Sequence, residues 1–193
     1  MSLAIITGST GLVGSEAVNF FHDKGFEVIG IDNNLRKLFF GENGSTNWIK
    51  SRLLKRNKNY KNYNVDIRNL NTLESIFKKN KKNISIIIHC AAQPSHDYGK
   101  QYPFLDFHVN ATGTLNLLEL TKKFCPVAPF IFMSTNKVYG DNPNNLKIIE
   151  KKKRWELNNN DPYFKGIDEK FSIDHSIHSF FGVSKSYADL IVQ

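Results

Sequence analysis

The chain has 193 residues, of which 40% are hydrophobic and 23% charged, and 26 Lys and Arg against 18 Asp and Glu give a formal net charge of +8. This composition is typical of a folded globular domain and excludes a disordered tail. No apolar run approaches the ~20 residues of a membrane-spanning helix. Two cysteines, Cys90 and Cys125, are too few for a disulfide framework or a four-ligand zinc site. We therefore expect a cytoplasmic protein without a metal.

The basic residues form short scattered patches rather than one continuous stripe. The patches are Lys50–Lys61, Lys78–Lys82 and Lys151–Arg154. No zinc-finger, RRM or KH pattern accompanies them. We interpret them as solvated surface and expect neither a nucleic-acid partner nor a membrane partner.

Apolar periodicity predicts strands and helices in alternation. In chain order these are a strand at 3–7, a helix at 12–24 that ends at Gly25, a strand at 26–31, and an Asn-rich loop at 33–58 holding a short helix at 48–54. A strand at 63–66, a helix at 70–79, a strand at 84–90, a helix at 104–124, a strand at 130–134 and a helix from residue 181 follow. Repeated β-α-β units predict an α/β fold, a Rossmann-type doubly wound parallel sheet covering 1–193.

The last predicted helix reaches the final residue, Gln193, on an apolar stretch without a capping residue. A helix of this kind needs a surface to pack against. A short helix docked on the sheet is one interpretation. We favour the other, that residues 1–193 are the N-terminal portion of a longer chain.

A glycine motif follows the first predicted strand directly and opens the first helix. Its glycines, Gly8, Gly11 and Gly14, suit a tight turn, a close backbone approach to a pyrophosphate and close helix–strand packing. The helix N-terminus that follows attracts anions. We therefore expect a dinucleotide at Gly8, Ser9, Thr10, Gly11, Leu12, Val13 and Gly14.

An acidic residue, Asp32, ends the second predicted strand, 21 residues after Gly11. A carboxylate at this place accepts hydrogen bonds from a ribose 2′-hydroxyl and repels a 2′-phosphate, which favours NAD over NADP. Arg36 and Lys37 lie near enough to leave NADP open. We expect Asp32 and Asn33 to contact the cofactor.

The spacing Gly8-x-x-Gly11-x-x-Gly14 resembles that of the extended short-chain dehydrogenase/reductase superfamily, which includes the nucleotide-sugar epimerases and dehydratases. Further motifs match in order: NVDIRN, HCAAQ, VNATGTLNLLE, STNKVYG and GVSK. The resemblance covers essentially the whole chain and implies a Rossmann fold with tightly held NAD. It places cofactor contacts at Asp66, Ile67, Ala91, Ala92, Gln93, Asn110 and Lys185.

The same resemblance implies a catalytic Tyr-x-x-x-Lys pair with a nearby hydroxyl. The hydroxyl falls on Thr135 and the lysine on Lys185, but the tyrosine position holds Phe181. A sugar hydroxyl that is oxidised must lose its proton to a base, and phenylalanine cannot accept one. His178, His96 and Tyr98 are alternative candidates for that base, although each alone is more often a surface or loop residue.

The segment STNKVYG narrows the predicted reaction. Sugar 4,6-dehydratases carry Asp-Glu after the threonine, whereas this chain has Asn136 and Lys137, which disfavours dehydration. With His178 and Ser179 before the last motif, the chain looks more like the CDP-paratose 2-epimerase (CDP-tyvelose epimerase) branch. That resemblance implies a CDP-sugar substrate, and a homo-oligomer when the chain is full length. We assign Ser95, His96, Asn136 and His178 to the substrate side.

Three functions remain open on the sequence. The first is an NAD-dependent nucleotide-sugar epimerase that oxidises a sugar hydroxyl transiently and returns the hydride. The second is another oxidoreductase or a lyase of the same superfamily. The third is a catalytically silent NAD-binding protein, which Phe181 favours.

Overall fold

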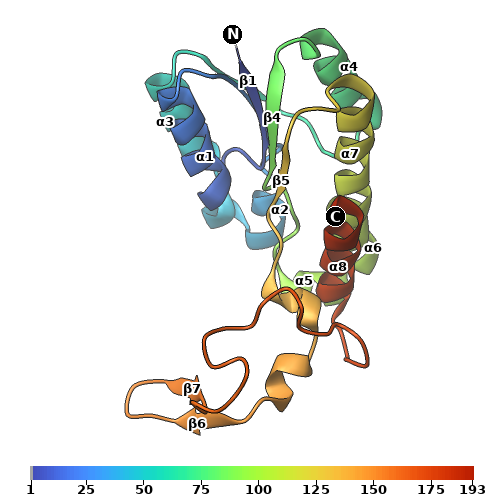
Figure 1. Cartoon of the computed structure of the whole chain (residues 1–193). Helices are drawn as coiled ribbons and strands as arrows, with labels where there is room; N and C mark the ends of the chain where they lie inside the picture. Colours follow the sequence, from blue (N-terminus) through green and yellow to red (C-terminus); the bar gives the residue numbers. More distant parts are fainter. Residues whose placement is uncertain (1) are drawn as a thin grey trace.

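The protein, described over residues 2–193 by a computed structural model, is built on a five-stranded parallel sheet (Figure 1). The strands are β1 (Leu3–Thr7), β2 (Glu27–Ile31), β3 (Tyr60–Tyr63), β4 (Ile84–His89) and β5 (Phe130–Phe132), in the order β3-β2-β1-β4-β5. The order reverses at β1, so the sheet is doubly wound and Rossmann-like. This confirms the predicted fold.

Both faces of the central strands are covered, which explains their continuous apolar sequence. Because side chains alternate along a strand, Leu3 and Ile5 face one core while Ala4 and Ile6 face the other. The first core includes residues of α4 (Leu70–Asn80) and α7 (Gly113–Phe124), and the second includes residues of α1 (Leu12–Asp23) and α3 (Asn47–Arg56). Figure 1 shows these helix pairs on opposite sides of the sheet.

The apolar residues of the predicted helix 12–24 suggest a buried face with Val13, Ala17, Phe20 and Phe21. Ala17 and Phe21 do pack against the core, but the fully buried face of α1 is a different one. The buried residues are Gly14, Ser15 and Val18, while Val13 is 50% exposed and Phe20 is 55% exposed. The reason is the tight packing of Gly14 on the preceding turn, which directs that side of the helix to the sheet.

The predicted strand 63–66 is wrong, because β3 lies earlier, at Tyr60–Tyr63. Tyr60 is 4% exposed, and its phenol lies where a side chain on Gly30 of β2 would stand, 2.5 Å from the ideal Cβ position. The missing side chain on β2 thus creates the place for Tyr60 and sets the register. Residues 64–66 then leave the sheet at its carboxyl edge.

The predicted helix 104–124 is interrupted. It begins as α6 (Pro103–Phe107), passes through a π-helical turn at His108–Thr112 and continues as α7. A π-turn inserts one residue into the helical ladder, and such insertions concentrate at functional sites.

Two regions contain more structure than the sequence indicated. The predicted loop 33–58 contains α2 (Arg36–Phe40) and a 3₁₀ turn at Glu42–Gly44 besides the helix expected at 48–54, which is α3, and α5 (His96–Gln101) follows β4. After β5 come 3₁₀ turns at Asn136–Tyr139 and Asn142–Asn145 and a hairpin of β6 (Ile148–Glu150) and β7 (Trp155–Leu157), which projects away from the sheet (Figure 1). These elements are too short to show a periodicity.

The final helix, α8 (Phe180–Val192), packs beside α6 and α7 (Figure 1). No helix within residues 2–193 combines the length and the apolar character that crossing a bilayer demands.

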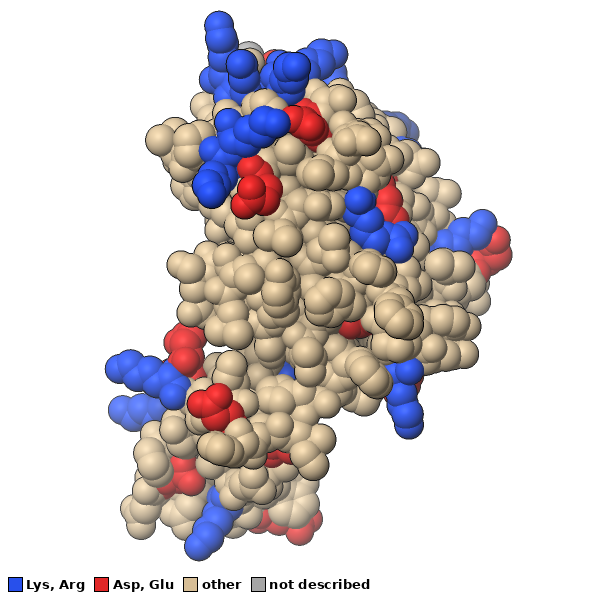
Figure 2. All heavy atoms as spheres, turned by 90° about the vertical axis from the view of Figure 1, so that its right-hand side faces the viewer, with Lys and Arg blue, Asp and Glu red and all other residues tan. Residues whose placement is uncertain are grey.

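Lys and Arg side chains gather at the top of the face in Figure 2, at the edge where the strands begin, while the middle of the face is largely uncharged and charges of both signs lie toward the bottom. The cause is the helix direction. Helices of a doubly wound sheet run opposite to its strands, so their carboxyl ends lie at this edge and attract cations. Lys78 and Lys79 end α4, and Lys122 and Lys123 end α7.

Candidate functional site

A cavity of about 280 Å³ lies at the carboxyl ends of β1, β2 and β4, where the strand order reverses. Ligands of open α/β sheets bind at this place. The predicted cofactor residues that line it are Gly8, Gly11, Leu12, Val13, Gly14, Asp32, Asn33, Asp66, Ile67, Ala91 and Ala92. Ser9, Thr10, Gln93, Asn110 and Lys185 do not line it.

The glycines of the first turn divide into two kinds. A Cβ on Gly14 would stand 2.1 Å from the Gly8 carbonyl oxygen, and one on Gly8 would stand 2.7 Å from the Ala91 nitrogen, so both are needed for backbone packing. A Cβ on Gly11 would meet only the Gly8 carbonyl oxygen, at 3.2 Å. Gly11 therefore leaves open space toward the cavity, as close approach of a ligand to the backbone requires.

The N-terminus of α1 suits an anion. Its N-cap, Gly11, supplies no side-chain hydrogen bond, and the first turn holds no acidic residue. The first amide groups of a helix lack partners within it and carry the positive end of its dipole. Together with the space at Gly11, this fits the pyrophosphate of a dinucleotide.

The Asp32 carboxylate lines the cavity and also ties its rim together. Its Oδ2 accepts from the Thr10 amide at 2.9 Å, and its Oδ1 accepts from the Asn34 amide at 2.8 Å. The side chains of Ser9 and Thr10 are turned into the protein. Ser9 Oγ lies 3.0 Å from the Tyr60 hydroxyl, and Thr10 Oγ1 lies 2.7 Å from Thr46 Oγ1.

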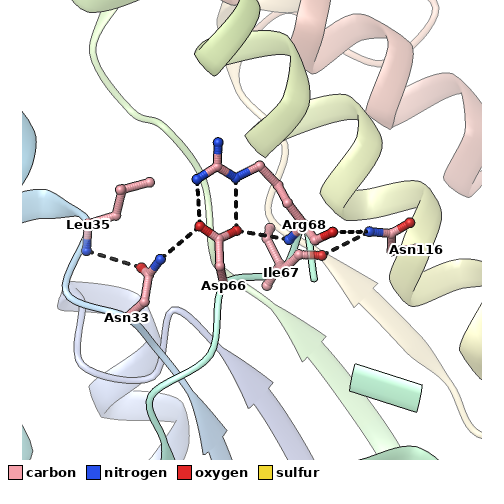
Figure 3. A network of polar contacts seen from close by, with 6 residues as sticks. All are labelled: Asn33, Leu35, Asp66, Ile67, Arg68 and Asn116. Atoms are coloured by element: carbon pink, nitrogen blue, oxygen red, sulfur yellow. Dashed lines mark hydrogen bonds and ion pairs between the residues drawn. The ribbon is translucent and has the colours of Figure 1, made fainter. Parts of the chain in front are cut away.

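Asp66 holds a polar network at the β2–β3 side of the cavity (Figure 3). Its carboxylate accepts from Arg68 Nε at 2.9 Å and Nη2 at 2.6 Å, from the Arg68 amide at 2.9 Å and from Asn33 Nδ2 at 3.0 Å. Burial raises the pKa of Asp66, but the hydrogen bonds from Arg68 outweigh it and hold that pKa below its usual range. Four donors occupy about all the lone-pair sites of a carboxylate.

A buried hydrogen-bond chain through His89 fixes the cavity wall at Ala91. Thr114 donates to the Asn110 carbonyl at 2.6 Å, so it accepts from Nε2 of His89, 2.9 Å away. Nδ1 of His89 then accepts from the Thr7 hydroxyl at 2.6 Å, and that hydroxyl accepts from the Ala91 amide at 3.1 Å. Every donor has one acceptor, which assigns a neutral ring with its proton on Nε2. Burial lowers the pKa of His89 to about 3.

The depressed pKa of His89 predicts a specific loss of stability in acid. Below pH 6.5 residue 89 becomes protonated in the unfolded chain, whereas in the folded chain it stays neutral until about pH 3. The unfolding free energy should therefore fall with a slope that approaches about 1.4 kcal/mol per pH unit, which amounts to about 2 kcal/mol between pH 6.5 and pH 4.5.

Urea unfolding of wild type and His89→Gln at both pH values measures this effect. The variant should be the less stable protein at pH 6.5, and the gap should shrink by about 2 kcal/mol at pH 4.5. The exposed His108 offers a matched control, His108→Gln, whose profile should follow that of wild type. A gap between wild type and His89→Gln that does not change with pH contradicts the assignment.

Gln93 and Asn110 belong to a buried polar network around Asp106, which the sequence did not single out. Gln93 Nε2 donates to Asp106 Oδ1 at 2.5 Å, and Ser184 Oγ donates to Asp106 Oδ2 at 2.5 Å. Asn110 Oδ1 accepts from the Gln93 amide at 2.8 Å. Each of the four is 1% exposed, and burial raises the pKa of Asp106. The network joins the loop after β4 to α6, the π-turn and α8.

The residues predicted for catalysis lie near one another without forming a Tyr-Lys pair. Phe181 and Lys185 are one turn apart on α8 and are 7% and 4% exposed. The Lys185 ammonium donates to the Met133 carbonyl at 2.7 Å and stands 4.1 Å from the centre of the Phe132 ring. Burial lowers the pKa of Lys185 to about 8.

Thr135 caps the 3₁₀ turn at Asn136–Tyr139, accepting from the Lys137 amide at 3.3 Å. It lines a separate open cavity of about 620 Å³, together with Asp189 and Leu190 of α8. Thr135 therefore lines a different cavity from the one at the glycine turn.

Three of the four residues assigned to the substrate side line one further cavity of about 340 Å³: His96, Asn136 and His178. His178 Nε2 donates to the Ile173 carbonyl at 3.0 Å, and its Nδ1 is buried without a partner in the described structure. Ser95 does not line this cavity. It caps α5, where its hydroxyl accepts from the Tyr98 amide at 3.2 Å.

Comparison with known proteins agrees with this architecture. The sequence model of the NAD-dependent epimerase/dehydratase family matches residues 4–166. The chain belongs to this family.

Relatives of known activity are nucleotide-sugar epimerases. The chain is similar to CDP-paratose 2-epimerase of Salmonella typhi, with 32% identity over 96% of this chain and 50% of the relative. It is 33% identical to UDP-glucuronate 4-epimerase of Thermodesulfobacterium geofontis over 74% of this chain and 42% of the relative. The UDP-Glc/GlcNAc 4-epimerase structure from Campylobacter jejuni matches with a TM-score of 0.73 and 22% identity, over 99% of this chain and 48% of that one. The chain thus spans about half the length of the relatives it matches.

Membership of this family fits the residues of the cavity, but the structure adds wall residues that the sequence motifs omitted. Leu35 and Phe39 of the segment around α2 line it, as does Pro94 after β4. The apolar run at 38–40 inside an otherwise polar stretch was the one available signal for a packed helix there.

Proposed function

We propose that this chain is the NAD-binding part of an NAD-dependent nucleotide-sugar epimerase. The observation that carries the proposal is the cavity at the strand reversal, where Gly11 leaves space beside the uncapped N-terminus of α1 and the Asp32 carboxylate lines the wall. Membership of an NAD-dependent family supports it.

In this proposal the glycine turn and the first amides of α1 bind the pyrophosphate. Asp32 accepts hydrogen bonds from the hydroxyls of the adenosine ribose, and Asn33 donates a hydrogen bond to the same ribose. Asp66 acts indirectly, because its carboxylate already accepts four hydrogen bonds and holds Asn33 and Arg68 at the rim. Ser9, Thr10, Gln93 and Asn110 position the backbone around the cofactor through their buried contacts. Arg36 lines the same cavity, but membership of an NAD-dependent family supports NAD rather than NADP.

Bound NAD supplies a reversible hydride acceptor for a sugar carbon that carries a hydroxyl. The chain must take the proton of that hydroxyl and return it to the sugar after the other face is presented. Thr135 supplies a hydroxyl for orienting the sugar, and Lys185 supplies a buried cation. Phe181 supplies no proton acceptor, which leaves Tyr98 and the two histidines of the 340 Å³ cavity, His178 and His96, as candidates for the base.

We propose a CDP-sugar as the substrate, as in the CDP-paratose 2-epimerase relative. Asn136 and Lys137 stand where dehydratases carry an acidic pair, which again disfavours dehydration. The free cysteines Cys90 and Cys125 are consistent with a cytoplasmic location. For the homo-oligomer, support comes from exposed apolar side chains on α6 and α8, including Phe104, which is 81% exposed.

A catalytically silent NAD-binding protein is the second candidate. Two observations favour it. Residue 181 is a phenylalanine, and the Lys185 ammonium already donates to the Met133 carbonyl and contacts the Phe132 ring. A different oxidoreductase or a lyase of the family shares the same cofactor site.

One experiment separates these functions. The protein is purified without added cofactor, denatured and assayed for released NAD, and a second sample is incubated with CDP-paratose and followed by NMR. Near-equal amounts of NAD and chain, with conversion of the sugar to its 2-epimer, are expected. NAD without conversion of CDP-paratose counts against the epimerase and supports the silent protein, and a protein that neither retains nor binds NAD refutes the proposal.

A further inference from the structure

The two halves of the sheet are joined above the cavity by aromatic side chains. α2 follows β2 and α5 follows β4, so the two short helices come from opposite sides of the strand reversal, and both lie beyond the carboxyl ends of the strands (Figure 1). The rings of Phe39 and Tyr98 meet edge to face with their centres 5.0 Å apart. The Tyr98 hydroxyl also donates to the Leu38 carbonyl at 3.3 Å.

Each side of this contact is anchored on a wall of the cavity. Phe39 lines the cavity and is 5% exposed. Tyr98 lies in the first turn of α5, which Ser95 caps, and Pro94 just before that cap lines the cavity. The buried Gln93 fixes the chain immediately before Pro94.

We propose that Phe39 and Tyr98 form an aromatic bridge that retains the dinucleotide in its cavity. This inference rests on the proposed function. A dinucleotide with its adenosine at Asp32 and its other end at Ala91 and Ala92 crosses from the β2 side to the β4 side. It therefore passes beneath the contact between α2 and α5. The bound molecule leaves in the direction of the strands only after the two rings have separated.

The segment that carries Phe39 is bounded by two turns. It lies between two residues with left-handed backbone conformation, Asn34 with φ of 57° and Gly41 with φ of 68°. Gly41 has nothing within 4 Å of its ideal Cβ position, so the chain turns in open space there. α2 has five residues and α5 has six, so few packed contacts oppose their separation.

The bridge predicts that removal of one ring speeds release of the cofactor. The protein is loaded with the fluorescent analogue 1,N6-etheno-NAD and mixed with excess NAD, and the dissociation rate is followed by fluorescence. Tyr98→Ala and Phe39→Ala should raise that rate by about 10- to 100-fold, because the two closing rings no longer meet. The association rate should not fall, and binding should stay near one dinucleotide per chain.

Two further variants make the result specific. Tyr98→Phe keeps the ring and removes only the bond to the Leu38 carbonyl, so its dissociation rate should stay within about 3-fold of wild type. Tyr187→Ala removes an exposed ring of α8 far along the chain from the bridge and should leave the rate unchanged. A general loosening of the fold would instead lower the amount of dinucleotide bound and the unfolding temperature together.

The outcomes distinguish this inference from the proposed function. Binding of etheno-NAD with wild-type dissociation rates in both alanine variants overturns the bridge and leaves the NAD site standing. Absence of saturable binding in the wild-type protein overturns the NAD site and the bridge with it.

Discussion

Phe181→Tyr should raise the rate of sugar epimerisation by about 100-fold or more. A positioned acid or base contributes roughly 10²- to 10⁴-fold to a proton-transfer step, and residue 181 now supplies none. Residues 181 and 185 lie one turn apart on α8, so a phenol at 181 shares a helix face with the Lys185 ammonium. A neighbouring cation favours the phenolate, which brings its pKa toward neutral pH.

The measurement is the rate of 2-epimer formation from the CDP-sugar, with NAD affinity determined in parallel. Phe180→Tyr is the matched control, because Phe180 is the adjacent residue on α8 and is 57% exposed. It adds the same hydroxyl to the surface and should leave the rate unchanged. If Phe181→Tyr binds NAD normally and shows no gain, the missing phenol does not limit this site.

The variants Gly14→Ala and Gly11→Ala should have different effects. The first should lower the stability of the fold, and the second should weaken the binding of NAD. A Cβ on Gly14 would lie 2.1 Å from the Gly8 carbonyl oxygen, so the helix must shift away from the turn. We expect Gly14→Ala to lose about 3 kcal/mol of unfolding free energy, at the upper end of ordinary overpacking. A Cβ on Gly11 meets only one atom, at 3.2 Å, and otherwise stands in open space.

Gly11→Ala should therefore fold with near wild-type stability and bind NAD at least about 100-fold more weakly, because its methyl group occupies the approach of the pyrophosphate. Urea unfolding and NAD titration of the two variants measure both effects. Equal NAD affinity in Gly11→Ala and wild type would place the pyrophosphate elsewhere. A fully stable Gly14→Ala would show that the turn does not require the close contact.

Local sequence patterns were sufficient to predict the elements whose structure depends on their own residues. β1 and β4 were predicted because strands buried on both faces are apolar throughout, and the helix at 70–79 because Leu73, Ile76 and Phe77 share one face, where they are 0–6% exposed. The glycine turn was equally readable, since its chemistry depends on residues adjacent in sequence.

Where a partner distant in sequence decides the structure, local patterns failed. β3 lies three residues before its predicted start because Gly30, on another strand, leaves room for Tyr60. Gln93 and Asn110 matched cofactor motifs, yet Asp106 and Ser184 hold them in the interior. Thr135 and Lys185 matched catalytic positions, but their surroundings depend on how α8 packs against the loop after β5.

The sequence by itself determined the class of fold, the glycine turn, the acid at the end of β2 and the absence of a phenol at residue 181. Each of these depends on residue type and short spacing, which the chain carries without reference to its fold. Only the tertiary structure decided that Gln93 and Asn110 belong to a buried network with Asp106 and that Phe39 meets Tyr98. These depend on contacts between residues of different segments, and such contacts exist only when the sheet and its helices have assembled.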